Sequence, residues 1–388
     1  MKICHIANYI SGYHRGSGGA EQACLNTIKA LYANGVENVV AATKPLKQPQ
    51  EKEFDFYPIT ISEDLIGWKL SFIKHFFYFD VISFFSLRKI LKKIKPDIVH
   101  LYNFDLISLS AISAAKSLKM PIVFSVYDYW VFSAAKGVTF NDGWLRRKIF
   151  NHFIKKIDIF IALSQHSKNL LIKNGINDDK IKTIPLMMDA NSKLLRKVEI
   201  EPKSIIFAGW IQPRKGLLTL IQAMPEIIKR ISDAKLYVFG MKENREYRKK
   251  IDNFIKDNNL NSNIKWDNES DKEKNRDKYF STFNKADILV VPEQWQNMSP
   301  VIVVEGMAAG KAIVASRIGG IPDIIEDKIS GVLANHDDSS DFASKIIVLL
   351  SNQSYSDKIK ENARVRFNEL FNNEISAGKL KNIYSAIL

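Results

Sequence analysis

"NMSPVIVVEGMAAGKAIVAS", residues 297–316, reads in order as a loop, a helix, a turn and a strand. Ser299 followed by Pro300 predicts the helix start, because Ser can cap free amides and Pro has a preset φ and no amide donor to lose. Gly310 predicts a left-handed stop, and the apolar residues after it predict a short buried strand. A helix and a strand in succession are the building unit of an α/β fold.

Glu305 lies in the second turn of that predicted helix, inside an otherwise apolar stretch. The helix N-terminus exposes unpaired amides and the positive end of the helix dipole, which together favour an anion. A carboxylate beside an anion site needs a separate role, and accepting hydrogen bonds from two sugar hydroxyls suits it. An ion pair with a nearby Lys is the alternative interpretation.

Apolar strands alternate with helices along the rest of the chain. The first half predicts strands at "KICHIAN", "NVVAAT", "PDIVHLYN", "PIVFSVYD" and "IDIFIALS". The second half predicts strands at "SIIFAGW", "AKLYVFG", "ADILVVP" and "KAIVAS", with a helix at "GLLTLIQAMPEIIKRI". Near-continuous apolar strands are typical of buried parallel sheets. We therefore expect an α/β protein of two doubly wound, Rossmann-like domains that face each other across a ligand cleft.

The length of 388 residues exceeds what one hydrophobic core usually supports. We expect an N-terminal domain over residues 1–190 and a C-terminal domain over residues 203–372. The weakly patterned residues 189–204 are the predicted linker. An amphipathic helix at about residues 373–388 is a candidate to pack back on the first domain.

Composition favours a soluble protein with reduced thiols. The longest mostly apolar run, residues 76–87, contains Asp80 and is too short to span a bilayer. The start of the chain lacks the apolar core and cleavage site of a signal peptide. The two cysteines, Cys4 and Cys24, fall in a predicted strand and a predicted helix, where we expect buried thiols and no disulfide. These features predict a cytoplasmic protein.

The formal net charge is +14, and the excess lies in the first half of the chain. Residues 1–200 contain 28 Lys and Arg against 17 Asp and Glu, whereas residues 201–388 contain 28 against 25. Nucleic acid, anionic lipid and phosphorylated small molecules all fit this charge. A nucleic-acid partner is disfavoured, because the sequence has no helix-turn-helix, RNA-binding or zinc signature.

Polar loops follow the predicted strands, where a parallel sheet places its ligands. Gly18 and Gly19 precede the first helix, and Arg214 and Lys215 precede a helix of the second half. Glycines let backbone amides approach a ligand, and two cations with amides could hold a diphosphate without a metal. A structural turn and solvated surface charges are the alternatives. The loops lack the dinucleotide G-x-G-x-x-G fingerprint, and the chain has no Asp-x-Asp, so we expect neither NAD nor a metal cofactor.

The sequence resembles the retaining, metal-independent glycosyltransferases of family 4, which have the GT-B fold of two facing Rossmann-like domains. The resemblance covers nearly the whole chain and rests on "GGAE" (18–21), "PDIVHLYN" (96–103), "VYDYW" (126–130), "FAGWIQPRKGLLTLIQAM" (207–224) and "WQNMSPVIVVEGMAAGKAIVASRIGGIPDII" (295–325). It implies transfer of a sugar from a nucleotide diphosphate donor, UDP or GDP linked, to a sugar or lipid-linked acceptor with retention of configuration. Such a reaction would serve surface polysaccharide, lipopolysaccharide or glycolipid synthesis.

By this resemblance, Glu305 matches the second Glu of the family's E-x7-E motif, which holds the donor ribose. The first Glu of the motif falls at Asn297, which can hydrogen-bond a sugar hydroxyl but carries no charge. Lys215 matches the family lysine that contacts the diphosphate. The Arg of that pair falls at Trp210, and whether Arg214 offsets the change is open.

The resemblance also implies three sets of site residues. The donor-binding set consists of Gly18, Gly19, Lys215, Asn297, Met298, Ser299, Pro300, Val301 and Glu305, with the backbone amides of Ser299 and Val301 meeting phosphate or sugar. The catalytic set within the same loops consists of Arg214, Lys215, Asn297 and Glu305. A weaker acceptor-side set consists of Tyr102, Asn103, Tyr127 and Asp128, in which both tyrosines stand where relatives often have His.

An aromatic and basic stretch over residues 64–95 bears on membrane association. Leu87, Ile90, Leu91 and Ile94 recur at helical spacing, with four basic residues at the positions between them. A helix that covers the sheet with a solvated basic face explains this pattern. Peripheral attachment to an anionic inner membrane face explains it too, and also explains the N-terminal charge excess.

The departures at Asn297 and Trp210 leave a second hypothesis. A catalytically lapsed relative could hold a nucleotide sugar or a protein partner without transferring the sugar. We favour the enzyme, because Glu305, Lys215 and both glycine-containing loops are present.

Overall fold

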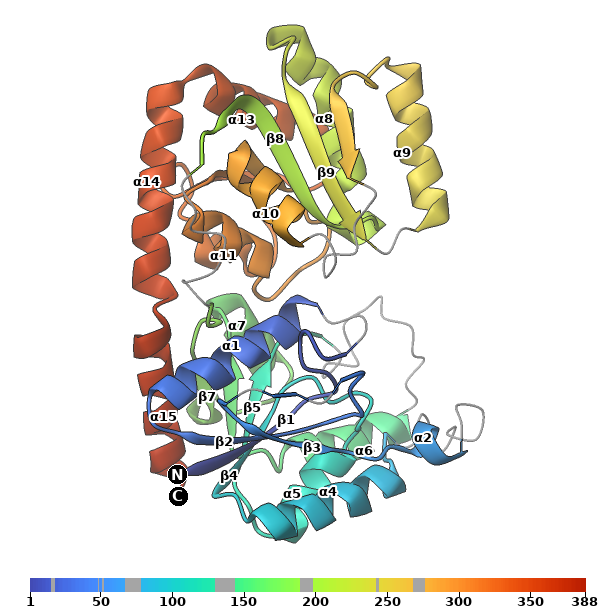
Figure 1. The fold of residues 1–388 in the computed structure, drawn as a ribbon, viewed down its shortest axis with the longest axis vertical. Coiled ribbons are helices and arrows are strands. Elements are labelled where there is room, and N and C mark those ends of the chain that lie inside the picture. The colour runs from blue at the N-terminus through green and yellow to red at the C-terminus, as the bar shows by residue number, and fades with distance from the viewer. Residues whose placement is uncertain are drawn as a thin grey trace. The chain divides into compact units, whose positions relative to one another are not determined.

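The computed structural model describes residues 1–14, 18–47, 49–50, 52–66, 78–129, 144–188, 198–241, 244–267 and 276–388. The chain forms two compact units (Figure 1). Unit 1 consists of Met1–Met188 and Asn372–Leu388, and unit 2 consists of Asp189–Phe371. Each unit has one parallel sheet with helices between its strands, so the predicted fold class of two Rossmann-like α/β domains is confirmed.

Unit 1 contains a seven-stranded sheet in the order β3-β2-β1-β4-β5-β6-β7. Its strands are β1 (Lys2–Ile6), β2 (Glu37–Ala42), β3 (Asp55–Pro58), β4 (Ile98–Leu101), β5 (Ile122–Val126), β6 (Ile159–Ala162) and β7 (Ile181–Thr183). Its helices are α1 (Gly19–Ala33), α2 (Ser62–Ile66), α4 (Val81–Ile94), α5 (Ser110–Ser117), α6 (Trp144–Ile154), α7 (Gln165–Lys173) and α15 (Asn373–Ile387). The strand order reverses between β1 and β4, which is where doubly wound sheets usually bind ligands.

Unit 2 contains a six-stranded sheet in the order β10-β9-β8-β11-β12-β13. Its strands are β8 (Glu201–Trp210), β9 (Lys235–Met241), β10 (Ile264–Asp267), β11 (Ala286–Val291), β12 (Ala312–Ser316) and β13 (Val332–Ala334). Its helices are the short η4 (Pro213–Lys215), α8 (Leu217–Arg230), α9 (Arg245–Asp257), α10 (Arg276–Lys285), α11 (Val301–Ala308), α12 (Ile321–Ile324), α13 (Ser339–Ser351) and α14 (Gln353–Leu370). Here the order reverses between the paired strands β8 and β11.

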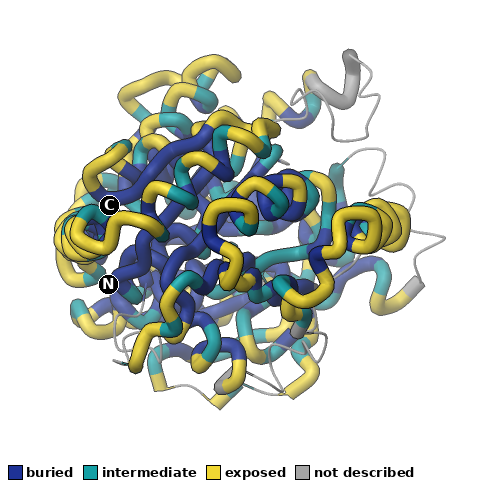
Figure 2. Tube along the Cα trace, turned by 90° about the horizontal axis from the view of Figure 1, so that it is seen from above, coloured by how far each residue is buried: buried dark blue, intermediate teal, exposed yellow. Residues whose placement is uncertain are grey.

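The central strands of both sheets are largely buried, whereas the edge strand β3 has no buried residue. Figure 2 shows buried segments mainly in the interior and exposed segments around the outside. Strands β11 and β12 are buried along their whole length, as expected for a sheet covered on both faces. Cys4 and Cys24 are both buried and free, which confirms the prediction for the two thiols. Among the helices that the structure describes, none has both the length and the apolar character needed to cross a bilayer.

The C-terminal helix α15 belongs to the core of unit 1. Its residues Leu380 and Tyr384 pack in one cluster with Ile3 and Ile98 of the sheet. The Tyr384 hydroxyl lies 2.5 Å from Nδ1 of the buried His100 on β4. The last helix of the chain is therefore tied to the first sheet by both apolar and polar contacts.

His100 is part of a buried polar network. The Tyr102 hydroxyl lies 3.2 Å from Nδ1 of His100 and 3.0 Å from Nδ1 of His5. On its other side, Nε2 of His5 is 2.9 Å from Oδ1 of Asn38. Burial lowers the pKa of His5 from 6.5 to about 4 and also lowers the pKa of His100, so both imidazoles are neutral near pH 7.

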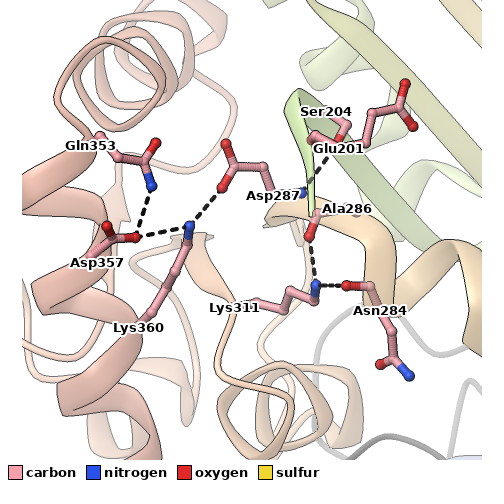
Figure 3. Close-up of polar contacts among 9 residues, drawn as sticks. All are labelled: Glu201, Ser204, Asn284, Ala286, Asp287, Lys311, Gln353, Asp357 and Lys360. Atoms are coloured by element: carbon pink, nitrogen blue, oxygen red, sulfur yellow. Dashed lines mark hydrogen bonds and ion pairs between the residues drawn. The ribbon is translucent and has the colours of Figure 1, made fainter. Parts of the chain in front are cut away.

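A second polar cluster lies at the amino ends of β11 and β12 (Figure 3). Lys311 is 2% exposed, and its Nζ donates to the carbonyl oxygens of Asn284 and Ala286, the latter at 2.5 Å. Beside it, Nζ of Lys360 lies 2.7 Å from Oδ1 of Asp287. Burial lowers the pKa of Lys311 to about 7. Lys311 thus joins the end of α10 to the start of β12 by its side chain.

Part of the predicted linker belongs to the sheet. Residues 201–204 are the start of β8, whereas residues 189–197 lie outside the described part of the chain. The strand begins earlier than expected because Glu201 pairs with Ala286 of β11, across a register shift near which Lys203 has a φ of +59°. Residues 67–77 of the aromatic and basic stretch, and Trp130 of "VYDYW", also lie outside the described residues.

Candidate functional site

Lys215 lies on η4, directly after the carboxyl end of β8, and makes an ion pair with Glu293 after the carboxyl end of β11. Glu293 is 1% exposed, and its Oε1 accepts a hydrogen bond from Nζ of Lys215. The Lys215 chain runs beside Gly209, where an added Cβ would lie 3.9 Å from Lys215 Cδ. The ammonium therefore has a defined place at the edge of the sheet where the strand order reverses.

The two loops that carry this pair are joined through their backbones. The amide of Gln294 donates to the carbonyl oxygen of Arg214 at 2.9 Å. Gly216 has a φ of +70°, and a Cβ there would lie 1.7 Å from the Pro292 carbonyl oxygen. Only glycine therefore allows the loop after β8 to approach the loop after β11 this closely.

Arg214 stacks on Trp210 at the end of β8. Its Cζ lies 4.8 Å from the centroid of the Trp210 ring, and its Nε donates to Oε1 of Gln212 at 3.2 Å. Stacking on an aromatic face and a hydrogen bond together restrict the planar guanidinium. Two cationic groups, Arg214 and Lys215, thus stand in the same short loop.

Asn297 lies in the loop between β11 and α11. Its Oδ1 accepts the Ser299 amide at 3.2 Å, and its carbonyl oxygen accepts the Gly320 amide at 2.7 Å. Gly319 has a φ of +59°, and a Cβ there would lie 2.5 Å from the Asn297 carbonyl oxygen. The Gly319–Gly320 turn therefore packs directly on the Asn297 backbone and holds it in place.

Helix α11 follows this loop and begins one residue later than it would if Ser299 were its N-cap. Pro300 is the N-cap, and no side chain caps α11, so the expectation that Ser299 caps this helix is wrong. The extended ψ of 115° at Pro300 places the helix start after the proline ring. Ser299 Oγ is buried and has no hydrogen-bond partner among the described residues.

Glu305 is partly buried in the second turn of α11. At the neighbouring Gly306, an added Cβ would lie 2.4 Å from Leu289 Cδ2, so α11 lies close against β11. The helix ends at Gly310, whose φ of +63° confirms the predicted left-handed stop. Met298, Ser299 and the N-cap proline are buried beside it, so the start of α11 is fixed by packing.

The remaining predicted residues lie in unit 1. Gly18 is the N-cap of α1, and its amide donates to Oε2 of Glu21 at 2.7 Å, while Gly19 is exposed. Asn103 and Asp128 are partly buried after the carboxyl ends of β4 and β5. The first turn of α1 thus already carries a carboxylate of its own.

Tyr102 is buried rather than displayed on a surface. Its side chain is 1% exposed, and its hydroxyl contacts two buried histidines. The Tyr127 ring stacks on the Tyr102 ring, with centroids 5.8 Å apart, and the Tyr127 hydroxyl lies 3.5 Å from Oγ1 of Thr27. The Tyr102 side chain is therefore committed to the core, and Tyr127 is the more accessible tyrosine of the two.

Sequence reasoning placed Lys215, Arg214, Asn297, Ser299 and Glu305 at the carboxyl edge of one sheet, and all five lie on segments that follow β8 or β11. It missed Glu293. A signal was present, because this carboxylate comes two residues after β11, where ligand-binding side chains are expected. Within the described part of the chain, no group of three or more His, Cys, Asp and Glu side chains is arranged to hold a metal ion.

Two protein-family models match consecutive parts of the chain. "Glycosyltransferase Family 4" matches residues 17–192, and "Glycosyl transferases group 1" matches residues 192–366. Together the two matches extend over nearly all of unit 2 and most of unit 1.

Similar curated proteins carry glycosyltransferase names. An uncharacterized glycosyltransferase of Methanocaldococcus jannaschii is 30% identical over 244 residues, 62% of this chain and 63% of its own length. The lipopolysaccharide 1,2-N-acetylglucosaminetransferase of Salmonella typhimurium is 34% identical over 133 residues, 33% of each chain. The matched regions thus span less than two thirds of either relative.

A solved structure extends the likeness to the whole chain. HepE of Anabaena, crystallised in complex with UDP, superposes with a TM-score of 0.76 over 100% of both chains at 16% identity. At this identity the likeness bears on the fold alone.

Proposed function

The chain belongs to glycosyltransferase family 4 and has the GT-B fold, and from this membership we propose that it transfers a sugar from a nucleotide diphosphate sugar to an acceptor hydroxyl. The observation that carries the proposal is that Lys215, Arg214 and the uncapped start of α11 all follow the carboxyl ends of the adjacent strands β8 and β11. Two cations and free amides are the groups that bind a diphosphate.

We assign the donor to unit 2. Lys215 and Arg214 meet the diphosphate, the amide of Val301 meets a phosphate or sugar oxygen, and Glu305 accepts hydrogen bonds from ribose hydroxyls. Asn297 is proposed to bind a hydroxyl of the donor sugar, for which its amide group has both donor and acceptor atoms.

Transfer with retention follows from a substitution on one face of the sugar. As the acceptor oxygen bonds to the anomeric carbon, the bond from that carbon to the phosphate oxygen breaks, and the acceptor proton passes to the departing phosphate. Negative charge grows on the diphosphate during this step. Lys215, Arg214 and the α11 N-terminus are proposed to stabilise that charge, which lowers the barrier without a metal ion.

The geometry at Trp210 bears on the alternative of a lapsed relative. Trp210 stands where the family resemblance places an arginine, and the Arg214 guanidinium lies on its ring. A positive group is therefore present near the position of the absent arginine. This favours an active enzyme over a protein that only binds a nucleotide sugar or a partner.

We propose a lipid-linked or oligosaccharide acceptor and peripheral attachment to an anionic inner membrane face through unit 1. A groove of about 620 Å³ is lined by residues of β3 and α4 that include Tyr57, Val81, Phe85, Lys89 and Lys93. Phe85 is 62% exposed and Val81 is 53% exposed, beside exposed lysines. Apolar side chains beside lysines are the features by which peripheral helices bind anionic lipid. The Salmonella relative is named for a lipopolysaccharide transfer, which supports an acceptor of this kind.

The test is turnover and donor binding by the purified full-length protein. Thermal shifts with UDP, GDP, ADP and their sugars identify the donor, because a ligand of the native state raises the Tm by mass action. Release of the nucleoside diphosphate from that donor then measures transfer or hydrolysis. Lys215→Ala is expected to lose most of this turnover when it is measured well below the Tm of the variant, which should itself fall because the buried Glu293 carboxylate loses its partner. Lys235→Ala, which breaks an exposed pair with Glu201, is the control and should keep wild-type turnover. Wild-type rates in Lys215→Ala would refute the assigned role.

A further inference from the structure

Glu293 is a buried carboxylate with only one of its two oxygens paired. Oε1 holds the Lys215 ammonium, whereas Oε2 is buried and has no hydrogen-bond partner among the described residues. Burying a carboxylate costs free energy that an incomplete set of partners does not recover. A favourable contribution to the free energy of folding therefore does not explain why Glu293 is buried beside Lys215.

The ion pair is also not needed to join the two loops. The Gln294 amide already binds the Arg214 carbonyl oxygen at 2.9 Å, and Nε2 of Gln294 lies 3.2 Å from Oγ1 of Thr219. These contacts connect the segments after β8 and β11 without any charge. The specific consequence of Glu293 is therefore the position and the electrostatic environment of the Lys215 ammonium.

An ammonium group has three N–H donors, and Glu293 accepts one of them. The Lys215 side chain remains 19% exposed, and two of its N–H donors are left over from the pair with Glu293. A lysine held in this way does not have to lose the rotational freedom of its long side chain when a phosphate arrives. The carboxylate also offsets the lysine charge and repels a nearby phosphate.

We propose that Glu293 is a positioning residue that fixes the Lys215 ammonium for the departing diphosphate and weakens the binding of the free diphosphate product. The inference rests on the proposed glycosyl transfer and assigns a role that the family motif does not contain. A fixed donor stabilises charge that develops during bond breaking, and a neighbouring anion limits binding of the released product. Glu293 itself touches neither the sugar nor the phosphate in this role.

Glu293→Gln tests the proposal, because it keeps the side-chain shape and removes the charge. Isothermal titration with UDP, GDP and ADP gives product affinity, and nucleoside diphosphate release from the donor that the wild type consumes gives kcat and KM. Removing the like charge should tighten product binding by roughly 3- to 30-fold. Loss of the fixed ammonium should lower kcat by roughly 10- to 100-fold. A purely structural role would instead weaken binding and turnover together.

Glu201→Gln is the matched control, because Glu201 pairs with Lys235 at the amino end of β8. It should leave product affinity and kcat at wild-type values. Unchanged affinity and kcat in Glu293→Gln, with the wild type active, would overturn the inference and leave the proposed function intact. A wild type that binds none of the three nucleotides would overturn the proposed function itself.

Glu293→Asp covers the case in which Glu293→Gln does not fold. The shorter carboxylate keeps the charge and draws the ammonium back by about one bond length. Product affinity should then stay within about twofold of wild type while kcat falls by roughly 10-fold or more. Equal kcat in Glu293→Asp and wild type would contradict the positioning role.

Discussion

The Arg214 guanidinium carbon lies 4.8 Å from the centroid of the Trp210 ring. The two residues are four positions apart in the sequence, and the intervening turn brings the cation back over the end of β8. Oε1 of Gln212 accepts a hydrogen bond from Arg214 Nε. The guanidinium is therefore held by the Trp210 ring and the Gln212 side-chain oxygen. Trp210, which stands where the family resemblance places an arginine, thus provides the surface on which the Arg214 guanidinium stacks.

Trp210→Ala is expected to weaken nucleoside diphosphate binding, because it removes the ring that orients Arg214. A cation–π contact of this kind is worth roughly 0.5–2 kcal/mol, so the Kd should rise by roughly 2- to 30-fold. Trp210→Phe keeps an aromatic face and should lose less. Isothermal titration with UDP, GDP or ADP gives the values, and equal affinities in Trp210→Ala and wild type would contradict an orienting role for the ring.

Glu305→Gln should weaken binding of the nucleotide through its ribose. The proposed contact is a carboxylate that accepts two hydroxyls, and the neutral amide loses about 1.5–3 kcal/mol of charged hydrogen bonding. If Glu305 contacts the ribose, then Glu305→Gln should bind the nucleotide about equally well with and without the ribose hydroxyls. Titrating both proteins with the ribonucleotide and its 2′,3′-dideoxy form completes this double cycle, and additive losses would exclude the contact.

Lys311→Met should destabilise unit 2 and change how its stability depends on pH. Two buried carbonyl oxygens lose their ammonium partner, at a cost of about 1–3 kcal/mol. The pKa of Lys311 is about 7 when folded, against an ordinary 10.5, so between these pH values the unfolded chain binds more protons. The Lys311 contribution to the unfolding free energy therefore rises as the pH increases from about 7 to 10.5, and Lys311→Met should lack it.

Urea unfolding at pH 7, 8 and 9 measures this difference, with Lys358→Met on the exposed side of α14 as the control. Parallel pH profiles for wild type and Lys311→Met would show that the ammonium stays charged in the folded protein.

Acid should destabilise unit 1 through its buried imidazoles. Burial lowers the pKa of His5 from 6.5 to about 4, so the unfolded chain binds more protons between these values. The His5 contribution to the unfolding free energy is present above pH 6.5 and is lost as the pH falls toward 4. His5→Gln should show a flatter profile than wild type between pH 7 and 4.5, measured by urea unfolding. His336→Gln, at an exposed position, should follow the wild-type profile.

Membrane attachment should depend on the lysines of α4. Replacing Lys89 and Lys93 by Glu reverses charge beside the exposed Phe85, and each basic residue near an anionic surface is worth about 1 kcal/mol. Sedimentation with phosphatidylglycerol vesicles at low salt should show binding by the wild type and its loss in the double variant. Lys256→Glu with Lys358→Glu makes the same charge change on unit 2 and should leave binding intact. No sedimentation of the wild type would refute the proposal.

Sequence patterns predicted the fold well where strands are continuous and apolar. The β11 and β12 strands and the left-handed Gly310 followed directly from such patterns. The short strands β10 and β13, of four and three residues, were not predicted, because pairing with a neighbouring strand rather than local sequence defines them.

The predicted site depended on which strand each loop follows, and that information is present in the sequence. What the sequence could not provide is how side chains pair across loops. The ion pair between Lys215 and Glu293 joins residues 78 positions apart, and the stack of Arg214 on Trp210 depends on the local turn. The Ser299 cap failed for a related reason, because burial of the Met298–Pro300 segment sets where α11 begins.

The placement of α15 also determines the order in which the two units can complete their folding. Tyr384 follows the whole of unit 2 in the sequence, yet its hydroxyl completes the polar network around His100 in the first sheet. During synthesis the first 188 residues leave the ribosome long before this partner exists, whereas unit 2 ends at Phe371 and already has all of its strands. The unit translated second can therefore finish folding first, and truncation within α15 would destabilise the sheet of unit 1, which is formed by the residues translated before unit 2.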